Sequence, residues 1–121
     1  MLNNFCVNLT RSTDDPDRAT VALVVANAAV ASGKNTSIFL ASEGVCLAAK
    51  GVANGINEEG LPAMATLLQN FIAAGGSIWV CSPCYKKRNY TDEDLIQGAT
   101  LVGAAKLVEF LTSDEAASVS Y

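Results

Sequence analysis

Two cysteines separated by two residues offer the strongest chemistry in this sequence. Cys81 and Cys84 form a CxxC motif, and three basic residues follow it directly, namely Lys86, Lys87 and Arg88. The reactive form of cysteine is the thiolate, which nearby positive charge favours. The motif therefore predicts a sulfur-handling site, in which one cysteine carries an additional sulfur atom as a persulfide or the two cysteines cycle through a disulfide. The alternative is that two small apolar residues meet by chance in a buried loop.

The CxxC motif is also common in zinc sites, but this sequence lacks the other ligands of a closed site. A structural zinc site needs about four ligands, and the chain has no histidine and no second CxxC pair. Cys6 and Cys46 fall in separate elements, where each is expected to be a small buried apolar side chain. The absence of histidine also excludes Ser-His-Asp and Cys-His triads. We therefore expect no metal and no histidine-based catalysis.

Glu43 is a candidate carboxylate for binding the substrate or partner. Its position at a predicted helix start allows two interpretations. It stabilises the first turn through the helix dipole, or it is an acid of the site that faces Cys81. The loop at residues 10–15 lacks the glycine that lets backbone N–H groups close on a phosphate. This composition argues against bound FMN, and no cofactor is expected.

The hydrophobic pattern alternates strands with helices and places these residues at strand ends. Strands are predicted at residues 2–9, 36–41, 77–80, 99–102 and 117–121, and helices at residues 16–32, 45–53, 61–74 and 104–111. Such alternation is typical of βαβ units. We expect one domain over residues 1–121, with an α/β class, three-layer α/β/α fold and a mainly parallel sheet of about five strands. Reactive groups of such sheets gather at the carboxyl ends of the strands.

The composition favours an oligomeric α/β protein of the cytoplasm. Half of the residues are hydrophobic and only 17% are charged, which is little charge for the surface of a small monomer. The net charge of −4 argues against a nucleic-acid partner, because such binding depends on many Lys and Arg contacts to phosphates. No apolar run approaches the roughly 20 residues of a membrane span. The start shows no secretion signal, so a reducing compartment with free thiols is expected.

The order of these elements resembles the DsrE/DsrF-like sulfur-relay proteins, including the subgroup labelled predicted peroxiredoxins. The similarity lies in the turn at residues 42–45, in the run Val80-Cys81-Ser82-Pro83-Cys84 followed by Lys87-Arg88, and in residues 98–110. The resemblance implies a small parallel-sheet α/β/α fold and homo- or hetero-oligomers, commonly trimers or hexamers. It also implies that Cys81 takes the position of the thiol that accepts a persulfide sulfur. The sequence departs from the relay pattern at Asn89, where those members have glycine, and in its extra thiol at Cys84.

Three hypotheses for the function follow. In the first, Cys81 accepts sulfur from a donor protein and passes it to an acceptor protein, while Glu43, Lys86, Lys87 and Arg88 bind the substrate or partner. In the second, Cys81 and Cys84 form a reversible disulfide that reduces partners or peroxide. In the third, the chain is a non-enzymatic oligomeric binding subunit whose cysteines are spectators.

Overall fold

The computed structural model describes residues 3–121, and within them five strands form one sheet in which every neighbouring pair is parallel. The strands are β1 (Asn4–Leu9), β2 (Asn35–Leu40), β3 (Ser77–Cys81), β4 (Ala99–Val102) and β5 (Ala116–Ser120). Their order across the sheet is β4-β3-β2-β1-β5. The predicted α/β class and parallel sheet are confirmed. Residue 2, at which the first predicted strand began, lies outside the described part of the chain.

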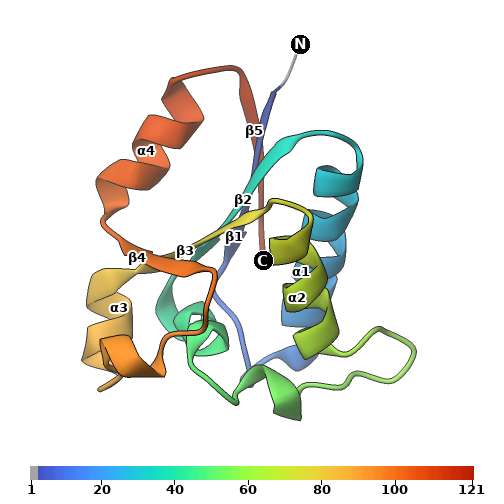
Figure 1. Cartoon of the computed structure of the whole chain (residues 1–121), viewed down its shortest axis with the longest axis vertical. Coiled ribbons are helices and arrows are strands. Elements are labelled where there is room, and N and C mark those ends of the chain that lie inside the picture. The colour runs from blue at the N-terminus through green and yellow to red at the C-terminus, as the bar shows by residue number, and fades with distance from the viewer. Residues whose placement is uncertain (1–2) are drawn as a thin grey trace.

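Helices cover both faces of this sheet. The helices α1 (Pro16–Ala31) and α2 (Met64–Ala73) lie side by side on one face, and α4 (Ala104–Thr112) lies on the other (Figure 1). A short helix, α3 (Ser82–Lys87), continues directly from the end of β3. Three 3-10 helices lie in the connections: η1 (Ser42–Ala48), η2 (Ala53–Gly55) and η3 (Asp92–Asp94). Among the described residues, no helix is long and apolar enough to cross a membrane.

The main hydrophobic core lies between the sheet and the α1/α2 pair. Alternate strand residues such as Leu9, Ile38 and Val80 are buried there against Leu23 and Phe71. Burial of each such side chain stabilises the fold by roughly 1.5–3 kcal/mol. A smaller buried cluster on the α4 face is formed by Cys6, Phe39 and Phe110. The sheet is therefore anchored from both sides, which fixes the position of its carboxyl edge.

The ends of α1 follow the sequence signals. The Asp15 carboxylate accepts a hydrogen bond from the Arg18 N–H at 3.1 Å, and Pro16 occupies the first helical position. After the helix, Gly33 has a φ of +83°, which glycine adopts without the steric cost that a Cβ brings. The chain can therefore turn sharply from α1 into β2.

One local prediction was wrong, and one short helix was not predicted. The segment predicted as a helix at residues 45–53 forms two 3-10 helices, because the chain turns between them at Gly51, where φ is +88°. The six-residue α3 was not predicted, since it is too short to show a helical period. Pro83 lies in its first turn, a position in which a missing N–H costs no hydrogen bond. The CxxC motif thus spans a strand end and a helix start.

Candidate functional site

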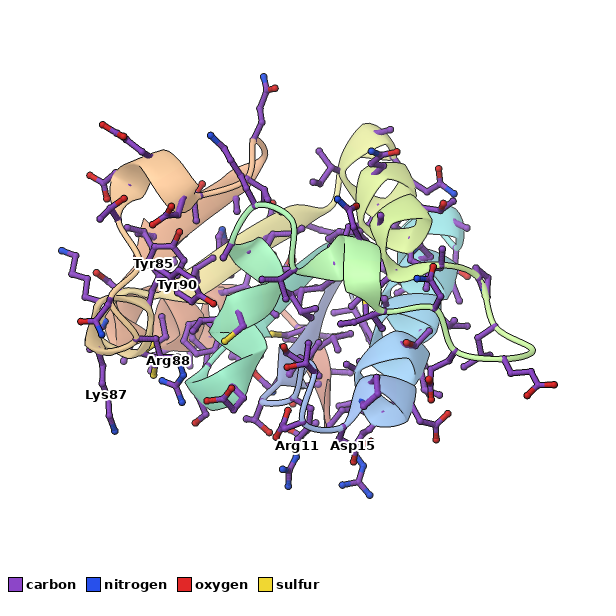
Figure 2. The ribbon with its side chains drawn as sticks, turned by 90° about the horizontal axis from the view of Figure 1, so that it is seen from below. Arg11, Asp15, Tyr85, Lys87, Arg88 and Tyr90 are labelled. Carbon is purple, nitrogen blue, oxygen red and sulfur yellow. The ribbon has the colours of Figure 1, made fainter. Side chains whose placement is uncertain are left out.

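Two loops meet at the carboxyl edge of the sheet and form the candidate site. The strands β2 and β3 are parallel neighbours, with Leu40 opposite Val80, so η1 and α3 start side by side. This edge faces the viewer in Figure 2, where Tyr85, Arg88 and Tyr90 gather on the α3 side, apart from Arg11. The start of η1 also packs against the end of β1, where residue 44 must be glycine because a Cβ there would lie 2.1 Å from the Leu9 carbonyl oxygen.

The two sulfurs of the CxxC motif are hydrogen-bonded to each other. The Cys81 S–H donates to Cys84, and this contact is the main cause that lowers the pKa of Cys84. The backbone N–H of Ser42 also donates to the Cys84 sulfur, and the charges of Arg88 and Lys87 lower its pKa further. All four of these interactions favour the anion, so Cys84 is the thiol of the pair that ionises first.

Cys81 has the opposite tendency. Burial raises its pKa, and the hydrogen bond to Cys84 raises it further, because that bond requires the Cys81 proton. The Cys84 backbone N–H and the Arg88 charge only partly offset these effects. The spacing of residues along the chain does not separate the two thiols in this way. The pair consists of an anion-favouring Cys84 beside a proton-bearing Cys81.

Arg88 connects this pair to η1. Its Nε donates to the Glu43 Oε1 at 2.9 Å, and its Nη1 donates to the Cys84 carbonyl oxygen at 3.1 Å. The ion pair raises the pKa of Arg88, which is charged at any pH of interest. Glu43 lies in the first turn of η1, as expected, and its carboxylate holds the guanidinium beside the motif.

Cys46 belongs to the same cluster, contrary to the expectation of a buried apolar side chain. It is partly exposed, its sulfur lies 3.6 Å from the Glu43 Oε2, and Tyr90 donates a hydrogen bond to it. Burial and the neighbouring Glu43 charge raise its pKa. The expectation holds for Cys6, which is fully buried and whose pKa burial raises to about 11.

The loop after α3 is fixed by two tyrosines. Tyr85 is fully buried and donates its hydroxyl to the Thr91 carbonyl oxygen at 3.1 Å. Its ring lies 5.1 Å from the ring of Tyr90. The Thr91 N–H in turn donates to the Asp94 carboxylate at 2.8 Å, as part of the capping box of η3. These contacts hold Tyr90 against Cys46.

Comparison with known proteins supports this assignment of the fold. A sequence profile described as the DsrE/DsrF-like family matches residues 3–117. The chain belongs to the DsrE/DsrF-like family. Among its relatives is the protein MJ0989 of Methanocaldococcus jannaschii, with 35% identity over 92% of this chain and 94% of the relative. Another is the protein MK0008 of Methanopyrus kandleri, with 33% identity over 82% of this chain and 78% of the relative.

Solved structures show the same fold at low sequence identity. The Escherichia coli ychN protein superposes with a TM-score of 0.81 at 19% identity and covers all of both chains. The protein MTH1491 of Methanobacterium thermoautotrophicum has a TM-score of 0.72 at 14% identity, with 98% of this chain and 99% of that chain covered. At such identities the likeness concerns the DsrE/DsrF-like fold alone.

Within this DsrE/DsrF-like chain, the structure brings together most of the residues singled out from the sequence. Cys81, Cys84, Glu43 and Arg88 share one network. Lys87 contributes its charge to Cys84, although its side chain points outward (Figure 2). Lys86 is exposed on α3 and is not among the groups that shift the pKa of either thiol most.

Three residues of the site were not identified from the sequence. Ser42 acts through its backbone N–H and has a φ of +51°, which no side-chain pattern indicates. The proximity of Cys46 to Glu43 could have been predicted from their spacing, because residues three apart lie one above the other in a 3-10 helix. Tyr90 reaches the site only through the loop geometry set by Tyr85.

Proposed function

We propose that this DsrE/DsrF-like chain is a sulfur carrier in which Cys81 accepts and passes on a persulfide sulfur. The observation that supports the proposal is the hydrogen bond from the Cys81 thiol to Cys84, whose anion is stabilised by Ser42 and Arg88. Cys84 then serves as the base for Cys81. A thiol of higher pKa is the stronger nucleophile once it is deprotonated, and the adjacent Cys84 thiolate is the group that can deprotonate Cys81.

The proposed step conserves atoms and electrons. The proton of Cys81 moves to the Cys84 thiolate along the existing hydrogen bond, and the Cys81 thiolate attacks the outer sulfur of a donor persulfide. A new S–S bond forms at Cys81, the S–S bond of the donor breaks, and the donor leaves as a thiolate. Cys84 returns the proton to that leaving thiolate. Transfer to an acceptor thiol is the reverse of this step, with no net oxidation.

Mass spectrometry tests the proposal directly. Reduced protein is freed of reductant, incubated with cysteine persulfide and analysed as intact chains and as peptides. The expected result is the added mass of one sulfur atom on Cys81, abolished by Cys81→Ser and slowed several-fold by Cys84→Ser. Cys6→Ser is the matched control, because Cys6 is fully buried. No adduct on the wild-type chain, with an active donor, contradicts sulfur transfer, and an adduct on Cys84 alone contradicts the assignment of Cys81.

The same sulfur–sulfur contact also favours a second candidate, reversible disulfide formation between Cys81 and Cys84. Both thiols are free in this structure. A redox titration separates the candidates, since this function requires a two-electron couple that Cys84→Ser abolishes. A non-enzymatic binding subunit instead requires that Cys81→Ala and Cys84→Ala leave assembly and biological activity unchanged.

The proposed activity implies particular partners, a compartment and an assembly. A persulfide carrier needs donor and acceptor proteins, and the exposed Lys86 and Lys87 beside Arg88 provide positive charge for acidic surfaces of such partners. We place it in the cytoplasm, where thiols stay reduced. The thin surface charge and the family resemblance support a homo-oligomer, a trimer or hexamer, that sedimentation equilibrium can measure.

A further inference from the structure

A second concave site lies away from the thiols. It is a cavity of about 780 Å³ between three segments: the end of η1 with the following turn, the helix α2, and the loop that leads into β4. Its apolar wall includes Leu47, Leu68, Ile72 and Ile96. None of the residues of the thiol cluster lines it. Cavities that bind small molecules measure about 300–1,000 Å³, so the size is appropriate for a ligand.

The cavity wall carries no charged side chain. The polar side chains that line it are the neutral amides of Asn54, Gln69 and Gln97. A charged ligand would lose its hydration in such a cavity without an opposite charge in return, which costs free energy. Three amides supply both donors and acceptors of hydrogen bonds. The wall is therefore suited to a neutral, mostly apolar molecule with a polar group.

Backbone hydrogen bonds hold the three walls in place. The Lys50 N–H donates to the Asp94 carbonyl at 2.7 Å, and the Ile96 N–H donates to the Ala48 carbonyl at 2.8 Å. Close packing adds to this at Gly98, where a Cβ would lie 2.9 Å from the Ile72 side chain. The cavity is thus preformed, as ligand sites usually are.

Among the described residues, no exposed large hydrophobic side chain lines the cavity that could form the centre of a protein interface. Protein interfaces have an apolar, well-packed centre. The exposed large hydrophobic side chains of the described residues are Val24 and Val108, and neither lines this cavity. The apolar side chains of the cavity therefore suit a molecule small enough to enter it.

We propose that this cavity binds a small neutral molecule, mostly apolar, whose polar group is held by Asn54, Gln69 and Gln97. This inference concerns a separate site and does not depend on the proposed sulfur transfer. It identifies the chemical class of the ligand: uncharged, with an apolar body that contacts the wall of η1 and α2.

Two fluorescent probes of the same skeleton test the proposal. N-phenylnaphthylamine is neutral, and anilinonaphthalenesulfonate carries an additional anionic group. Fluorescence titration of the full-length chain is expected to show saturable binding of the neutral probe at one site per chain. The anionic probe is expected to bind at least about tenfold more weakly, a difference of about 1.4 kcal/mol. No saturable binding, or equal affinity for both probes, overturns the proposal.

Variants of α2 place the bound probe in the cavity. Ala65 and Ala73 both line it, and either Ala65→Trp or Ala73→Trp should fill it and weaken the neutral probe at least about tenfold. The matched control is Thr66→Trp on the same helix, at an exposed position that does not line the cavity. Circular dichroism verifies that each variant is folded. Unchanged probe affinity in both folded filling variants overturns the proposal. If the wild type binds no probe and the filling variants lose their oligomeric state, the cavity is an interface between chains and the proposal is likewise overturned.

Discussion

The guanidinium of Arg88 lies 2.9 Å from the carboxylate of Glu43, although 45 positions separate the two residues in the sequence. The same guanidinium donates to the Cys84 carbonyl oxygen, so the loop after β2 and the helix after β3 are joined at the CxxC motif. The two side chains are 22% and 43% exposed, and such a pair contributes roughly 0–1 kcal/mol to stability. Its main consequence is to hold a positive charge beside the thiols.

Replacing Arg88 should therefore change thiol reactivity more than stability. In Arg88→Met the Cys84 thiolate loses an attractive charge, so its pKa should rise and its alkylation by iodoacetamide at neutral pH should slow several-fold. Arg88→Lys keeps the charge and should give an intermediate rate. The rates are measured by peptide mapping of quenched samples. Equal rates in wild type and Arg88→Met would show that the guanidinium does not act on Cys84.

The three thiols should become reactive in a defined order as the pH is raised. The pKa of Cys84 is lowered and that of Cys81 is raised, so Cys84 should be alkylated at a lower pH than Cys81. Cys6 should react last, because its pKa is about 11 and its side chain is buried. Pulsed alkylation across a pH series measures the order, and denatured protein provides the control in which the three react alike. Earlier reaction of Cys81 contradicts the role of Cys84 as the base.

Glu43 should affect Cys46 in the opposite sense to Arg88. The carboxylate charge raises the pKa of Cys46, so Glu43→Gln should lower that pKa and speed alkylation of Cys46 several-fold. The stability of the fold should change by less than about 1 kcal/mol, because the ion pair is partly exposed. Glu59→Gln, at an exposed carboxylate outside the site, is the matched control. Unchanged reactivity of Cys46 in Glu43→Gln would show that the Glu43 carboxylate does not act on the Cys46 thiol.

The contact between Gly44 and the end of β1 should be sensitive to one added methyl group. In Gly44→Ala the new Cβ would meet the Leu9 carbonyl oxygen at 2.1 Å, and relief of such overpacking typically costs about 1–3 kcal/mol. Gly55→Ala is the control, because a Cβ at residue 55 has no atom within 4 Å. Urea unfolding followed by circular dichroism compares the two. Equal stability would mean that η1 is free to move away from β1.

The buried hydroxyl of Tyr85 should stabilise the loop that carries Tyr90. Tyr85→Phe leaves the Thr91 carbonyl without its donor, which should lower the free energy of unfolding by roughly 1 kcal/mol. Tyr90→Phe is the informative comparison, since it removes the hydroxyl that contacts Cys46 and should alter alkylation of Cys46 rather than stability. A destabilising Tyr90→Phe together with a neutral Tyr85→Phe would reverse these assignments.

Much of the fold could be predicted because it depends on patterns that are local in the sequence. The strand at residues 99–102 was predicted with the bounds of β4, and the helix predicted at residues 16–32 agrees with α1 within one residue. The residues around Gly51 were harder, because the spacing of apolar residues does not separate 3-10 from α geometry. The positive φ of Gly51 separates η1 from η2 in that segment.

The candidate site shows the same division. The sequence by itself determined that a CxxC motif with a basic neighbour follows a strand of a parallel sheet, because residue type, spacing and alternation are all written along the chain. Only the tertiary structure decided that the Ser42 N–H reaches Cys84 and that Cys46 joins Glu43 beside Arg88. Which thiol ionises first depends on those contacts. They arise where parallel strands end side by side, between residues that are far apart in the sequence.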